Sequence, residues 1–217
     1  LGMVVRVEGT IDTSTEPQTG QAERVYFDDE IEGPVSDVQP RVDLGDPGQF
    51  KELTVLGKKI LIEEGATNFS DGPAVFDTFV VGFVVDDVFA ISGLVDDELG
   101  VVRATYVKKK EPFVPDETVV ELKGVVSAFT PGTTTFMLGT VTVEFGNADL
   151  SDLPEGEVED GMVEVKGTLS DVGVIQALKI ELDIPRDDDD DDVAVDEFST
   201  TGFVNCTLDC ADFDFSI

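Results

Sequence analysis

The chain has 217 residues, 41% of them hydrophobic, and 47 acidic residues outnumber 14 basic ones for a formal net charge of -33 at pH 7. This hydrophobic content is enough for folded cores, whereas so negative a surface repels phosphate backbones, and we expect no nucleic acid partner. Histidine is absent, which removes the usual general base and any Ser/His or Cys/His nucleophile pair; we expect no enzyme activity, no catalytic residue and no cofactor.

The first predicted element is a β-hairpin within residues 1–30. The stretch "GMVVRVEGTIDTSTEPQTGQAERVYF" holds two runs of alternating apolar residues joined by a polar turn that contains glycine. The same pattern recurs in residues 86–107 and 160–182, with Gly9, Gly93 and Gly167 in equivalent places. Alternation joined by a glycine-bearing turn is typical of β-hairpins, so the sequence predicts three copies of one hairpin with these glycines at its turns.

A second pattern precedes two of these hairpins. "EIEGPVSDV" at 30–38 matches "ELKGVVSAF" at 121–129, and a third beginning, "STTGFVN", lies at 199–205. These segments align on Gly33, Gly124 and Gly202, which we also expect at turns. Together with a further matching pair, "LGKKILIEEGATNFSD" and "LGTVTVEFGNADLSD", they predict a repeat of about five strands.

The repeats divide the chain into five predicted parts. Residues 31–110 and 118–184 are complete repeats, residues 1–30 are the C-terminal half of a repeat, and residues 198–217 are the N-terminal half of another. "KKKEPFVPDE" links the complete repeats, and residues 185–197, with Pro185 and six consecutive aspartates, form an acidic linker. We expect the basic cluster Lys108 to Lys110 to form salt bridges with an acidic neighbouring domain.

The segments "VELKGVVSAF", "TFMLGTVTVEF", "DGMVEVKG" and "VIQALKIEL" resemble the DUF5666 family of exported bacterial proteins. The resemblance covers nearly the whole chain and implies an all-β fold of tandem small five-stranded OB-like antiparallel barrels joined by short linkers. It supplies no catalytic residues. It implies a secreted, extracellular or cell-surface location in the bacterial envelope.

Cys206 and Cys210 are the only cysteines, and their spacing matches no zinc signature. In the oxidising compartment that the resemblance implies, a disulfide across a tight hairpin is favoured over two unpaired thiols.

The many acidic residues offer weaker candidates for a site. The run Asp187 to Asp192 is expected to be a solvated linker, with weak divalent-cation binding as the alternative. Adjacent pairs such as Asp86 with Asp87 or Asp96 with Asp97 are interpreted as turn residues rather than as the two carboxyls of a glycosidase.

These observations predict a non-enzymatic structural protein whose partners are other copies of itself or further tandem domains, arranged end to end. No apolar run approaches the ~20 residues of a membrane-spanning helix, and we expect no membrane span. Complementary half-repeats at the two ends indicate either a fragment of a longer array or a fibre subunit that assembles head to tail by strand complementation. The alternative is a secreted module that binds carbohydrate or peptide on a barrel face, which the absence of Trp and the presence of only two Tyr disfavour.

Overall fold

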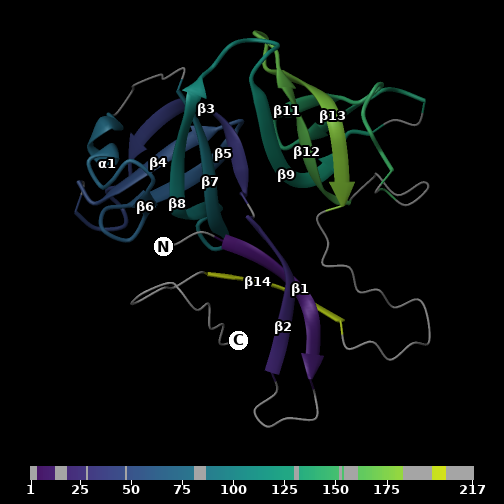
Figure 1. The fold of residues 1–217 in the computed structure, drawn as a ribbon. Helices are drawn as coiled ribbons and strands as arrows, with labels where there is room; N and C mark the ends of the chain where they lie inside the picture. The colour runs from purple at the N-terminus through teal and green to yellow at the C-terminus, as the bar shows by residue number, and fades with distance from the viewer. Residues whose placement is uncertain are drawn as a thin grey trace.

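The computed structural model describes residues 4–12, 19–27, 29–46, 48–80, 87–129, 132–151, 153, 161–182 and 197–203. Strands dominate these residues, and their one helix is the short α1 (Val75–Thr78). The predicted all-β fold class is confirmed. Figure 1 shows the strands in three groups: β3–β8, β9–β13, and β14 with β1 and β2.

The first strand group follows the N-terminal hairpin. Its strands are β3 (Ile31–Pro40), β4 (Phe50–Val55), β5 (Lys58–Glu63), β6 (Asn68–Phe69), β7 (Asp87–Asp96) and β8 (Val101–Pro112). The pairings run from β3 to β4, β5, β8 and β7, and β7 pairs again with β3. The pair β5–β8 is parallel and the other four pairs of this cycle are antiparallel.

The second strand group has the same order of pairings. Its strands are β9 (Val119–Ser127), β10 (Thr135–Leu138), β11 (Val141–Glu144), β12 (Met162–Leu169) and β13 (Val174–Leu182). The cycle runs from β9 to β10, β11, β13 and β12 and returns to β9. The parallel pair is β11–β13, which are the third and fifth strands of this cycle in chain order, as β5 and β8 are in the first group. The two groups are joined into one 11-stranded sheet because β3 also pairs with β9.

The alternation seen in the sequence decides which side chains form the core. Along β12, Val163, Val165, Gly167 and Leu169 are buried, and the residues between them are partly or fully exposed. A strand's successive side chains point to opposite faces, so such a strand buries one face only. The core cluster collects these faces from both strand groups, including Ile31, Leu53, Ile60, Ile91, Leu122, Phe136, Val143, Val165 and Ile180. Each fully buried aliphatic side chain stabilises the fold by roughly 1.5–3 kcal/mol.

Three glycines occupy the same unusual place in three hairpins. Gly9, Gly93 and Gly167 each have an alanine as strand partner, in the pairs Gly9↔Ala22, Gly93↔Ala104 and Gly167↔Ala177, and a β-bulge directly precedes each pair. An added Cβ would lie 2.0 Å from the carbonyl oxygen of Gln21, 2.5 Å from that of Arg103 and 2.3 Å from that of Gln176, respectively. Glycine is needed here because the opposite backbone approaches too closely for any side chain.

These positions differ from the turns that the sequence predicted. Gly9, Gly33, Gly93, Gly124, Gly167 and Gly202 all lie within strands. In the hairpins that contain Gly93 and Gly167, the glycines in the turns, with positive φ, are the later ones of the pattern, Gly100 and Gly173. The physical reason is that a bulge and a turn both require glycine, so the residue type alone does not separate them.

The third group, the terminal sheet, unites the two ends of the described chain. It has the order β14–β1–β2, with β1 (Val4–Asp12) in the centre, β2 (Thr19–Phe27) on one side and β14 (Glu197–Phe203) on the other. Val4 and Val5 are adjacent in sequence and both buried, so both faces of β1 are covered at the start of the strand.

The register of β14 on β1 repeats the register found in the other two groups. Gly202 lies opposite Val5, Gly124 opposite Val163, and Gly33 opposite Phe89. In each case the partner is four residues before the bulge glycine of its hairpin, Gly9, Gly167 or Gly93. The predicted half-repeats therefore meet within one chain over their described strands.

Candidate functional site

The most unusual feature of the described residues is the seam, which we define as the ladder between β3 and β9. It pairs Ile31 with Leu122 and Glu32 with Glu121 in antiparallel fashion. Ile31 and Leu122 correspond to each other, since each lies two residues before the glycine, Gly33 or Gly124, that aligns the two strands. An antiparallel pair in which equivalent residues face each other marks a local two-fold axis between the strand groups.

A second contact supports the same local two-fold relation. Two-residue turns connect β4 to β5 at Leu56–Gly57 and β10 to β11 at Gly139–Thr140. A Cβ added to Gly57 would lie 2.1 Å from the hydroxyl oxygen of Thr140, so the second residues of the two turns meet. Gly57 also has a φ of 76°, which a β-branched residue could hardly adopt.

Charged side chains accompany the seam in an ordered way. Glu32 and Glu121 are strand partners, and opposed like charges destabilise a ladder. Each carboxylate has a lysine beside it: the Lys110 ammonium is 2.7 Å from the Glu32 carboxylate, and the Lys166 ammonium is 3.3 Å from that of Glu121. The negative charge of Glu121 raises the pKa of Lys166 above its usual range. The lysines therefore offset the repulsion at the centre of the seam.

An ion pair between a buried lysine and a partly buried carboxylate lies next to these residues on β9 and β12. Lys123 has only 5% of its side chain exposed, and its ammonium is 3.7 Å from the carboxylate of its strand partner Glu164. Burial, reinforced by the nearby negative charge of Glu121, raises the pKa of Glu164 to about 7, and the positive charge of Lys123 only partly opposes this. Glu164 is therefore poised to gain or lose a proton near neutral pH.

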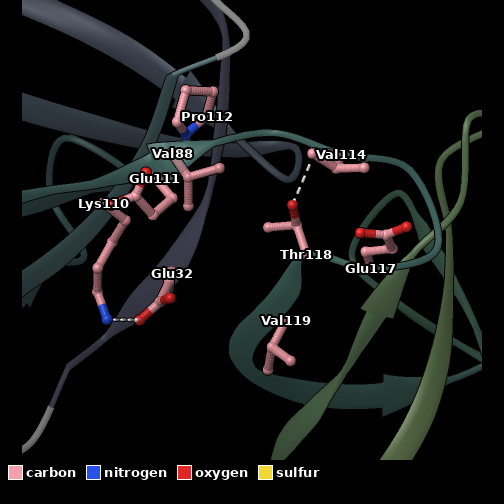
Figure 2. Close-up of a pocket in the computed structure, with 9 residues that line it drawn as sticks. All are labelled: Glu32, Val88, Lys110, Glu111, Pro112, Val114, Glu117, Thr118 and Val119. Carbon is pink, nitrogen blue, oxygen red and sulfur yellow. Dashed lines mark hydrogen bonds and ion pairs between the residues drawn. The ribbon is translucent and has the colours of Figure 1, made fainter.

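A cavity of about 370 Å³ lies where the first strand group is connected to the second. Figure 2 shows its walls, with the Lys110–Glu32 ion pair on one side and the Val114 amide donating to the Thr118 hydroxyl at 2.7 Å on the other. The remaining lining residues are Val88, Glu111, Pro112, Glu117 and Val119. The volume is at the lower end for a small-molecule site. Three carboxylates against one lysine make it unsuited to anions.

The structure pairs the acidic and basic residues that the sequence singled out. Lys110 contacts Glu32, and Lys109 contacts Asp87 at 2.6 Å. The predicted partner of this basic cluster was a neighbouring domain, but both carboxylates belong to the first strand group itself, because β8 lies beside β7, which pairs with β3. Asp96 contacts Arg103 at 2.5 Å, and this contact is the main cause of its lowered pKa.

Several predicted sites fall outside the described residues. Cys206, Cys210 and the acidic run Asp187 to Asp192 lie there, so the disulfide and the weak cation site stay predictions. Within the described ranges, no group of three or more Cys, Asp or Glu side chains is arranged to hold a metal ion. In the same part of the chain, no helix is long and apolar enough to cross a membrane.

The sequence did not predict the seam or the buried ion pair. Ladder partners from distant strands leave no trace in periodicity, and a lysine in an alternating strand is ordinarily assigned to the solvent face. The sequence did hold one signal for charged pairs at this place. The residue before the aligned glycine is Glu32 in one segment and Lys123 in the other, so the two matched positions carry opposite charges.

Comparison with known proteins adds no relative to this picture. No protein-family model, curated protein or solved structure matches the chain.

Proposed function

We propose that this chain is a non-enzymatic, extracellular or cell-surface structural protein built from tandem five-stranded OB-like barrels. The two complete repeats would occupy residues 31–110 and 118–184. A five-stranded cycle of pairings with one parallel pair, between the third and fifth strands, is the arrangement of an OB-fold barrel. Both strand groups have this order, which supports the proposal.

The observation that carries the proposal is the register of β14 on β1. Gly202 pairs with Val5 in the register that the complete cycles use for their first and fourth strands. The N-terminal hairpin would then supply the fourth and fifth strands of a third repeat, and β14 its first. A repeat whose strands come from two segments far apart in the sequence, 4–27 and 197–203, has the topology from which strand exchange can build an end-to-end assembly.

Strand exchange requires only that β14 leave β1 of its own chain for β1 of another copy. Residues 183–196 connect β13 to β14, and fourteen residues span at most roughly 45–50 Å when fully extended. The ladder gained between copies would be the ladder lost within the chain. The balance between closed monomer and fibre would therefore depend on protein concentration and on screening of the charge of -33.

The chemistry of the described side chains favours a structural role. The ion pairs at the seam and around Lys109 and Arg103 involve partners within the fold itself. The second candidate is a binding module, and the cavity near Thr118 is the observation that favours it. Its small volume and its mainly acidic polar groups make the structural role the stronger proposal.

Engineered disulfides test the third repeat and its exchange together. In a C206S/C210S background, we expect Glu8→Cys with Ser199→Cys to oxidise readily, because these residues are strand partners. Glu8→Cys with Thr201→Cys is the matched control, since the partner of Thr201 is Arg6. Non-reducing electrophoresis then separates an internally linked monomer from a ladder of linked chains.

Each outcome of this experiment has a distinct meaning. A ladder that grows with protein concentration supports the fibre, and a monomer linked at all concentrations leaves the third repeat closed within the chain and removes the fibre. Equal oxidation of the matched pair and the control pair would contradict the third repeat itself.

A further inference from the structure

β14 differs from its counterparts β3 and β9 in the use of its two edges. β3 and β9 each pair with the fourth strand of their own cycle on one edge, and with each other on the opposite edge. Within the described residues, β14 pairs only with β1 and lies at the edge of its sheet. An unpaired strand edge presents backbone donors and acceptors to any strand that can approach it.

The positions that correspond to the seam can be assigned on β14. Alignment on Gly202 makes Thr200 the counterpart of Ile31 and Leu122, which face each other across the seam. Their neighbours in the seam, Glu121 and Glu32, correspond to Ser199 and Thr201.

We propose that β14 pairs antiparallel with β14 of a second copy of this chain, with Thr200 opposite Thr200 and Ser199 opposite Thr201. The proposal rests on the third repeat of the proposed function. The two complete repeats occupy each other's seam edges, which leaves the third repeat without a counterpart in the described chain. A second copy offers the same strand related by a two-fold axis, which is the relation that the seam already has.

The residue types of β14 suit a strand that pairs with itself. The seam opposes Glu32 to Glu121 and needs Lys110 and Lys166 beside them. The corresponding positions of β14 are the uncharged Ser199 and Thr201, so a symmetric pairing brings no like charges together at its centre. The segment "EFSTTGF" also lacks the lysine and proline that protect exposed edges from association.

Cross-linking in trans tests the register of this interface. Two variants are made, Ser199→Cys and Thr201→Cys, each in a C206S/C210S background, and one carries a purification tag that changes its mass. Each variant is oxidised alone, and an equal mixture of the two reduced variants is oxidised as a third sample. We expect a disulfide-linked heterodimer in the mixture at least tenfold more abundant than either homodimer, because the register opposes 199 to 201. A heterodimer no more than about twice as abundant as either homodimer, which is the ratio of random pairing, or no cross-link, would overturn the proposal.

A charge test, measured by sedimentation velocity, needs no added cysteine. Ser199→Lys with Thr201→Glu places opposite charges across the two-fold axis and should preserve the dimer. Ser199→Lys with Thr201→Lys opposes like charges twice and should weaken dimerisation roughly tenfold. The second variant makes the net charge of -33 less negative, so weaker association would not come from overall repulsion. Ser199→Glu with Thr201→Lys controls for the ladder to β1, where the partners are Glu8 and Arg6, because it opposes like charges there and opposite charges across the two-fold axis, and it should keep the dimer.

The results separate this proposal from the proposed function. If the disulfide of the Glu8→Cys, Ser199→Cys variant forms within or between chains but the cross-link between positions 199 and 201 does not, the third repeat stands and the β14 interface is wrong. A parent protein that sediments as a monomer at every concentration and salt strength would also contradict the interface.

Discussion

The two complete strand groups share one order of pairings but differ in what fills and flanks it. The first group adds the helix α1, whose Phe76 is buried in the core. The Lys51 ammonium lies over the Phe76 ring, 4.1 Å from its centre. The second group instead carries the ion pair of buried Lys123 with partly buried Glu164. What they share is the bulge glycine with its alanine partner and the aligned glycine of the first strand. The frame therefore depends on a few backbone-determined positions, and the remaining residues are free to differ.

The largest expected effect is a loss of stability confined to the core of the second strand group. Phe136 in β10 is 1% exposed, and Phe136→Ala should destabilise the second group by about 3–5 kcal/mol through lost burial and a cavity. If the groups unfold as separate repeats, denaturant titration followed by hydrogen exchange should show loss of protection in β9–β13 while β4 and β5 stay protected.

The matched control for this variant is Val172→Ala. Val172 is 77% exposed in the turn before β13, and its truncation should change the free energy of unfolding by less than about 0.5 kcal/mol. Equal loss of protection in both groups after Phe136→Ala would mean that the seam makes them one cooperative body.

The bulge glycines should give the next largest effect, and the same effect in both groups. Gly167→Ala and Gly93→Ala each force a Cβ to within 2.5 Å of a backbone carbonyl oxygen, and we expect about 2–4 kcal/mol of destabilisation for each. Gly48→Ala is the control, because a Cβ there meets nothing within 4 Å. Chemical denaturation measures the free energy of unfolding of all three variants. A mild effect of Gly167→Ala alone would show that the bulge glycine contributes less to stability in the second group than in the first.

The difference between the groups also shows what the sequence could predict. Alternation in segments such as "MVEVKG" indicated strands because period two directly reflects the pleat, and the all-β class followed. Gly93 and Gly167 were aligned from their sequence neighbours, but their place in bulges depends on the approach of the opposite strand, which no local pattern contains.

The candidate site was less predictable than the fold for the same reason. The Glu32–Glu121 opposition depends on the register between strands from different strand groups, and the burial of Lys123 depends on what packs over it. Long-range geometry of this kind is set by tertiary packing rather than by propensity.

The smallest expected effect concerns Glu164, which the first group replaces with Ala90 at the corresponding place, three residues before the bulge glycine. Its pKa is raised from 4.5 to about 7 in the folded protein, mainly by burial. The folded state therefore holds this proton more tightly than the unfolded state does, and the resulting stability is complete below about pH 4.5 and is lost as the pH rises to 7. Glu164→Gln cannot ionise, so above pH 7 it should be more stable than the parent, on the order of 1 kcal/mol because partial exposure screens the charge. Its advantage should shrink as the pH falls toward 4.5, where both proteins carry a neutral group.

Thermal melts across this pH range measure the difference in stability between Glu164→Gln and the parent. Glu98→Gln, which removes an exposed carboxylate, is the control for the general gain in stability from a less negative net charge. A Glu164→Gln advantage that is independent of pH, or equal to that of Glu98→Gln, would mean that the carboxyl beside Lys123 in the second group does not titrate in this range.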